Sequence, residues 1–167
     1  MFTELLSFPN PVNEKAARTV AAGVVVLAAV TLATSWYWLA AVLAYGFVAR
    51  VLSGPRLSPL GRVASSVIAP ALGPSKPVPG PPKRFAQGVG AVFSTGAALA
   101  ALAFADGAVA DALLAMLLVA ASLESVLGLC LGCRAFALLM RAGVIPERVC
   151  LECADISSRR AAPAPQR

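Results

Sequence analysis

The stretch TVAAGVVVLAAVTLATSWYWLAAVLAYGFVA, from Thr19 to Ala49, contains no charged residue. It is too long for one membrane-spanning helix, which needs about 20 apolar residues. Hydroxyl groups and three aromatic rings gather in its middle, at TSWYW (34–38). Because Trp and Tyr favour the membrane–water interface, this cluster predicts a tight turn between two spans. We expect one span at about residues 16–34 and the other at about 36–52.

The composition of the whole chain also indicates a membrane protein. Hydrophobic residues make up 59% and charged residues 13%, against about 45–50% and about 25% in soluble domains. The mean hydropathy is +0.79. Two further apolar stretches predict spans at residues 85–104 and 108–131. We therefore expect an all-α bundle of four transmembrane helices over residues 1–155, in contact with a lipid bilayer, and a disordered tail over 156–167.

The basic residues predict the orientation of this bundle. Four spans alternate direction, so the turns near residues 35 and 106 lie on one side, and neither turn carries any of the fourteen Lys and Arg residues. The positive-inside rule then predicts a multi-pass protein with both termini in the cytoplasm. The net charge of +6 follows from topology and from attraction to anionic lipid. Nucleic acid is not an expected partner.

The loop between the second and third predicted spans, Ser53 to Arg84, holds eight of the thirteen prolines. Within it, SPLGRVASSVIA (58–69) places apolar side chains on one helical face, which predicts a short helix lying in the membrane interface. The segment PSKPVPGPP (74–82) is too rich in proline for a helix interior. We expect it to form an extended strap.

Glu124 lies about two turns, or about 10 Å, inside the predicted fourth span. A carboxyl group at that depth is costly and normally faces the bundle interior. One interpretation is structural: a neutral, hydrogen-bonded Glu, or a pair with Arg18 or Arg50. The other is a proton acceptor for nearby thiols. On an uninterrupted helix Cys130 projects about 120° away from Glu124, so contact between the two requires a break near Gly128.

The four cysteines form two C-x-x-C pairs, CLGC (130–133) and CLEC (150–153), and the chain contains no histidine. If Gly128 and Gly132 interrupt the helix, a restarted helix places the first pair at its N-terminus, which lowers the pKa of a cysteine. Three interpretations stay open: thiol redox chemistry or sulfur transfer, a four-cysteine zinc site, and small buried hydrophobic residues. The candidate catalytic residues are Cys130, Cys133, Cys150, Cys153 and Glu124, and the same four cysteines are the candidate zinc ligands.

Five short segments together resemble a bacterial membrane family, domain of unknown function 4395. They are FPNPVNE (8–14), GPRLSPLGR (54–62), GPPKRFAQ (80–87), CLGC (130–133) and CLEC (150–153). The resemblance implies an integral membrane protein with four spans and an association with thioredoxin-like and sulfurtransferase proteins. The matching motif residues are Asn10, Asn13, Glu14, Arg56, Lys83, Arg84 and the four cysteines.

These observations favour a membrane thiol protein that exchanges electrons or sulfur with a thioredoxin-like or sulfurtransferase partner on the cytoplasmic side. A non-catalytic membrane scaffold with a structural zinc ion is the alternative. A small transporter of a sulfur compound is the third hypothesis, but apart from Glu124 the spans offer few polar side chains to line a path.

Overall fold

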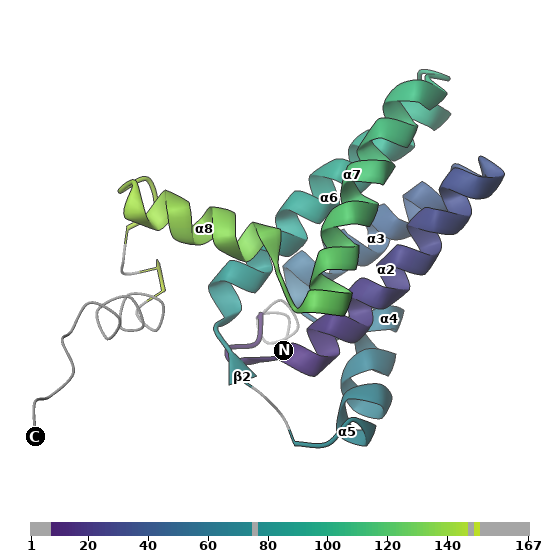
Figure 1. Cartoon of the computed structure of the whole chain (residues 1–167). Coiled ribbons are helices and arrows are strands. Elements are labelled where there is room, and N and C mark those ends of the chain that lie inside the picture. The colour runs from purple at the N-terminus through teal and green to yellow at the C-terminus, as the bar shows by residue number, and fades with distance from the viewer. Residues whose placement is uncertain (1–7, 75–76, 147–148, 151–167) are drawn as a thin grey trace, which may run out of the picture.

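The computed structural model describes residues 8–74, 77–146 and 149–150, and it is all-α apart from one two-residue strand pair. Four long helices form a bundle: α2 (Glu14–Thr34), α3 (Trp38–Ser53), α6 (Gly80–Leu102) and α7 (Gly107–Leu127). A fifth, α8 (Leu131–Arg141), leaves one end of the bundle at a wide angle (Figure 1). Helix α6 packs against α3, α7 and α8, and α2 packs against α7.

The turn predicted at TSWYW is confirmed. Helix α2 ends at Thr34, Ser35 takes a left-handed φ of 54°, and α3 begins at Trp38. Trp36 and Trp38 are 57% and 56% exposed, as the interface interpretation requires. Tyr37 behaves differently, because its hydroxyl donates a 3.1 Å hydrogen bond to Asp111 Oδ1 on α7. That bond holds the α2–α3 and α6–α7 turns at the same end of the bundle (Figure 1).

Three helices among the described residues are long and apolar enough to cross a membrane: α2, α6 and α7. Their outward faces carry large apolar side chains, such as Val26, Val92 and Val119, which are 61%, 71% and 58% exposed. Such faces suit a lipid bilayer rather than water. Helix α3 is apolar but has only 16 residues, short of the about 20 that a span needs. The fourth span and the cytoplasmic termini therefore stay predictions.

Small residues let the helices approach closely. Ala28, Ala40, Ala97 and Ala110 are fully buried between them. At Gly90 a Cβ atom would overlap the ring of Phe47, so this glycine is needed where α6 crosses α3. Such close packing of small residues is the usual source of helix association in lipid, where the hydrophobic effect does not drive helices together.

The proline-rich strap forms only in part. Its residues Pro77–Val78 make β2, which pairs antiparallel with β1 (Val12–Asn13). Helix α6 then begins at Gly80, five residues before the predicted start of the third span. The expectation of a non-helical 74–82 was wrong for Gly80, Pro81 and Pro82. Proline is tolerated in the first helical turn, because the amide hydrogen that it lacks would have no partner there.

The helix predicted within 58–69 is present as α4 (Pro59–Val63), the π-helical turn η1 (Ala64–Ile68) and α5 (Ala69–Ala71). Val63 and Val67 on it are 48% and 62% exposed. Its position at a membrane interface stays a prediction. The tail over 156–167 and Cys153 lie outside the described residues.

Candidate functional site

The break near Gly128 that contact between Glu124 and Cys130 requires is present. Helix α7 ends at Leu127, and Gly128 takes a left-handed φ of 66°. A residue with a side chain is strained in that conformation, which explains the glycine at this helix end. The chain then restarts as α8, whose first turn lies so close to α6 that a Cβ on Gly132 would stand 2.6 Å from Ala86 Cα. The predicted fourth span of 108–131 is therefore four residues shorter at its end.

The restart makes Cys130 the N-cap residue of α8. Its sulfur accepts a 3.4 Å hydrogen bond from the backbone N–H of Cys133. Cys130 is buried, Cys133 is half-buried, and both are free thiols. The first turn of a helix presents unpaired N–H groups and the positive end of the helix dipole, and both favour a negative sulfur.

The two thiols have opposite pKa shifts. The pKa of Cys130 is lowered, first by a hydrogen bond from the Cys133 side chain and further by Lys83 and the Cys133 N–H, against the effects of burial and Glu124. The pKa of Cys133 is raised, because its thiol hydrogen is held by Cys130 and because it is buried. Thiolates are the reactive form of cysteine. The arrangement therefore favours the thiolate form at Cys130 and the protonated thiol at Cys133.

Glu124 pairs with Lys83, whose Nζ donates a 2.6 Å hydrogen bond to Glu124 Oε1. Both side chains are nearly buried, at 10% and 15% exposed. The interpretation that Glu124 pairs with Arg18 or Arg50 was wrong. Arg18 donates to the backbone carbonyls of Ser125 and Val126 at the end of α7 instead.

Lys83 was missed as a site residue because it falls before the predicted start of the third span. Helix α6 begins early enough to place it in the first turns, facing α7. The sequence signal was the lysine in GPPKRF (80–85), since a proline pair followed by a helix-forming run is typical of a helix start.

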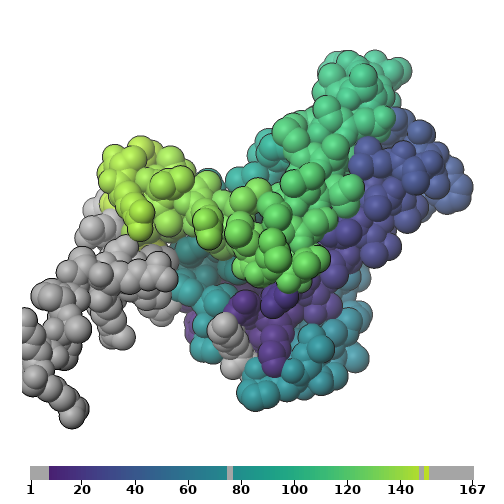
Figure 2. All heavy atoms as spheres, viewed as in Figure 1, coloured from purple at the N-terminus to yellow at the C-terminus, as the bar shows by residue number. Residues whose placement is uncertain are grey.

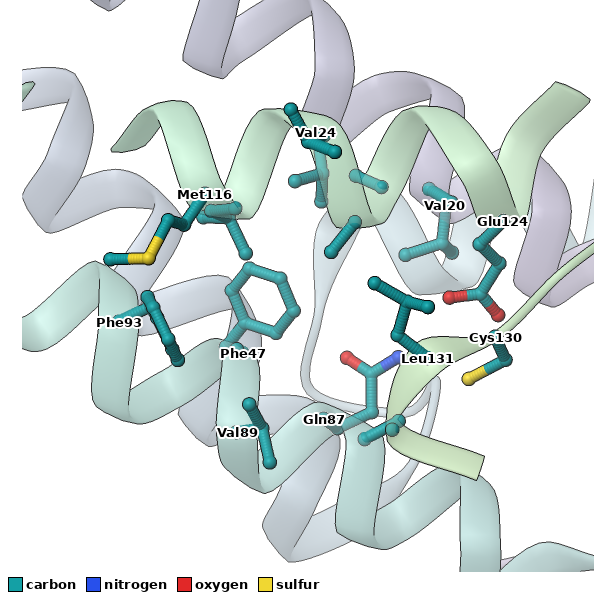
Figure 3. A pocket seen from close by; sticks show the side chains of 18 of the residues that line it. Val20, Val24, Phe47, Gln87, Val89, Phe93, Met116, Glu124, Cys130 and Leu131 are labelled. Atoms are coloured by element: carbon teal, nitrogen blue, oxygen red, sulfur yellow. The ribbon is translucent and has the colours of Figure 1, made fainter. Parts of the chain in front are cut away.

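Glu124 and Cys130 lie side by side at one end of a cavity of about 620 Å³ (Figure 3). Elsewhere its walls are apolar, and Phe47, Phe93 and Met116 lie at the far end. Gln87 is the other polar side chain at the cysteine end. We call this space the thiol cavity. Its position means that a molecule inside the bundle could reach the Cys130 sulfur without first crossing α8.

The second cysteine pair is described only in part. Cys150 is buried and disulfide-bonded, while Cys153 lies outside the described residues. Val149 lies in a hollow with Phe85 of α6 and Phe136 of α8, so the chain after α8 folds back towards the bundle. Figure 2 shows α8 beside α7 on the face of the molecule turned to the viewer. Within 8–74, 77–146 and 149–150, no group of three or more Cys, Asp or Glu residues is placed to hold a metal ion.

The comparison with protein families matches residues 12–141 to the family described as domain of unknown function 4395. The chain belongs to this family. The matched range includes Lys83, Glu124, Cys130 and Cys133 and stops before Cys150. No curated protein matches, and no solved structure matches.

Proposed function

We propose that this protein is a membrane thiol protein in which Cys130 and Cys133 carry out thiol–disulfide exchange or sulfur transfer with a thioredoxin-like or sulfurtransferase partner. One observation carries the proposal. Cys130 caps the N-terminus of α8, accepts the Cys133 N–H and lies beside the Lys83–Glu124 pair. Every one of the groups that stabilise its thiolate is held by a packed helix.

The exchange step balances as follows. The Cys130 thiolate attacks one sulfur of a partner disulfide, the partner S–S bond breaks, and the second partner sulfur leaves as a thiolate. Cys133 then gives up its proton and attacks the Cys130 sulfur, which forms the Cys130–Cys133 disulfide and releases the other partner sulfur as a thiolate. The cysteine pair, which starts as one thiolate and one thiol, loses two electrons and one proton, and the partner disulfide gains the two electrons.

Sulfur transfer uses the same nucleophile. The Cys130 thiolate attacks the outer sulfur of a partner persulfide, the partner's inner sulfur leaves as a thiolate, and Cys130 carries the persulfide. No net oxidation occurs. In the exchange step Glu124 is the proposed acceptor of the Cys133 proton, because its carboxylate lies beside Cys130 and is held there by Lys83.

The second pair, Cys150 and Cys153, is the proposed relay to and from the first, since the chain after α8 turns back towards the bundle. We place this chemistry on the cytoplasmic side of a bacterial inner membrane. What supports this is the absence of Lys and Arg from the two turns at the other end. The Tyr37–Asp111 bond joins those two turns.

Trapping of a mixed disulfide tests the proposal. Full-length protein in detergent is mixed with a thioredoxin-like protein that carries an accessible disulfide. The variant Cys133→Ser should accumulate a mixed disulfide through Cys130, because the second attack is lost, and Cys130→Ser should accumulate none. Equal trapping by the two variants would overturn the assigned roles. One tightly bound zinc per chain, with all four thiols unreactive, would replace the proposal by the scaffold alternative.

A further inference from the structure

A second hollow, of about 180 Å³, is lined by Lys83 and shares Gln87 with the lining of the thiol cavity. Three segments that are distant in the sequence contribute to its walls, within residues 8–13, 54–61 and 83–87, and Arg50 of α3 and Ser65 complete its polar lining. We call it the arginine hollow. The segments are parts of FPNPVNE, GPRLSPLGR and GPPKRFAQ, and of the residues that they contribute to this hollow the proposed chemistry of the thiol pair uses only Lys83.

Arg50 is the unusual residue of this hollow. It is 5% exposed, and its guanidinium lies 4.5 Å from the ring centroid of Phe47. Its Nε donates to Gln87 Oε1 at 2.8 Å, and its Nη1 donates to Ser58 Oγ at 3.1 Å. Its Nη2 is buried and has no hydrogen-bond partner among the described residues. A buried, charged donor without an acceptor is costly, so this atom indicates a missing acceptor.

The other polar groups around the hollow favour an anion as that acceptor. The Lys83 ammonium, the Asn13 and Gln87 amides and the Ser65 hydroxyl all line it, and the described residues of its lining include no carboxylate. Glu124 faces Lys83 from the thiol cavity, where it engages the ammonium through one hydrogen bond. An ammonium carries three donors, which leaves Lys83 able to contact a second acceptor.

The walls are held in place before any ligand arrives. Gly54 has a φ of 65°, and a Cβ on it would overlap the ring of Pro9. A Cβ on Gly61 would stand 3.0 Å from Pro55 Cα. The segment 54–61 therefore packs closely against Pro9 of the N-terminal segment, and its two ends pack against each other. A rigid site loses little entropy on binding, which favours affinity for a small ligand.

We propose that the arginine hollow binds a small oxyanion group, of the sulfate, thiosulfate or phosphate type, with Arg50 as its main contact. Guanidinium groups recognise such oxygens through paired hydrogen bonds. A cavity of about 180 Å³ is smaller than the about 300–1,000 Å³ of pockets for drug-sized ligands, so it suits one such ion and is too small for a nucleotide. The proposal rests on Arg50 and the hollow, not on the cysteines.

Anion-dependent thermal stabilisation of the full-length protein in detergent tests the proposal. Sodium sulfate and sodium thiosulfate are titrated at constant ionic strength, with chloride as the balancing ion. The native chain should show a saturable rise in Tm. Arg50→Gln should weaken anion affinity at least about tenfold, since it removes a charged hydrogen bond. Arg62→Gln is the matched control, because Arg62 is exposed on α4 and does not line the hollow.

A second variant keeps the test decisive if Arg50→Gln does not fold. Ser65→Asp places a carboxylate in the hollow, so it should raise Tm without added anion and abolish the response to sulfate. A full sulfate response in Ser65→Asp, or a saturable sulfate response of equal size in Arg50→Gln and Arg62→Gln, would overturn the proposal.

The oxyanion could be free or could be the phosphate of a lipid headgroup, and native mass spectrometry distinguishes the two sources. If free sulfate does not bind but the native chain retains phosphatidylglycerol from defined vesicles and Arg50→Gln loses it, the source is lipid. Binding of free sulfate in lipid-free detergent assigns a soluble anion. If the native chain binds neither free sulfate nor phosphatidylglycerol, the proposed oxyanion site is wrong.

Discussion

Lys83 on α6 and Glu124 on α7 form an ion pair with 2.6 Å between Nζ and Oε1, although they are 41 residues apart. The pair lies between the thiol cavity and the arginine hollow, because Glu124 lines the first and Lys83 lines the second. Through space Lys83 also favours the thiolate of Cys130. This one contact therefore joins the packing of α6 on α7 to the chemistry of the cysteine pair.

Lys83→Met should destabilise the protein by about 3–5 kcal/mol, since breaking a nearly buried ion pair leaves an uncompensated charge. The free energy of unfolding is measured by denaturant titration in mixed micelles. Lys83→Met with Glu124→Gln should be more stable than Lys83→Met alone, because no charge is then left unpaired. Arg84→Met is the control on the same helix, because Arg84 is exposed and its Nε donates to the Val51 carbonyl and not to Glu124. Strictly additive effects of the two substitutions would show that the pair does not interact.

Cys130 should react with iodoacetamide at a lower pH than an ordinary cysteine. The rate follows the thiolate fraction, which rises with pH around the pKa, and the pKa of Cys130 is lowered by the Cys133 side chain and by Lys83. Cys133→Ala should move the reactivity profile to higher pH, and Lys83→Met should move it in the same direction. The profile is measured in a chain with Cys150 and Cys153 changed to Ser. An unshifted profile in Cys133→Ala would show that Cys133 does not stabilise the thiolate.

Gly128→Ala should destabilise the protein by about 1–2 kcal/mol, because the left-handed conformation at this position is unfavourable for a side chain. It should also slow alkylation of Cys130, since a straightened helix carries the sulfur away from Glu124 and Lys83. Gly88→Ala is the matched control. Gly88 lies inside α6 with nothing within 4 Å of an added Cβ, so alanine there should be neutral or stabilising. Similar losses from both substitutions would contradict the role of the turn at Gly128.

Much of this architecture follows from local sequence. The TSWYW turn and the break at Gly128 were both predictable, because each is built from residues with a strong local preference: aromatic rings for an interface, glycine for a left-handed helix end. The N-terminal position of Cys130 on α8 followed from the same break. These features depend on a few neighbouring residues, and distant packing does not change them.

The partners across helices were not predictable. Arginines near the ends of apolar helices ordinarily extend to the interface, yet Arg50 turns inward to Gln87 and Ser58. Lys83 became the partner of Glu124 only because α6 begins at Gly80. The first turn of α6 places Lys83 opposite Glu124. That turn was not expected, because the prolines within 74–82 predicted a non-helical segment.

The number of spans can be tested at the two turns joined by Tyr37 and Asp111. Helix α3 rises about 24 Å over its 16 residues, less than the about 30 Å of a bilayer core. If α3 nevertheless crosses, the α2–α3 and α6–α7 turns share one side of the membrane, as the 3.1 Å bond between Tyr37 and Asp111 favours. If α3 does not cross, α6 must carry the α6–α7 turn to the opposite side.

Single cysteines at Thr34 and Ala103, both exposed and one in each turn region, should therefore react alike with a membrane-impermeant maleimide in intact cells. The four native cysteines are first changed to Ser. Arg62→Cys, at the other end of the bundle, is the control and should react only after permeabilisation, because the positive-inside rule predicts a cytoplasmic position. Labelling of Thr34→Cys without labelling of Ala103→Cys would give three spans and move the C-terminal cysteine pairs to the outer side, where an oxidising environment would favour a lasting disulfide.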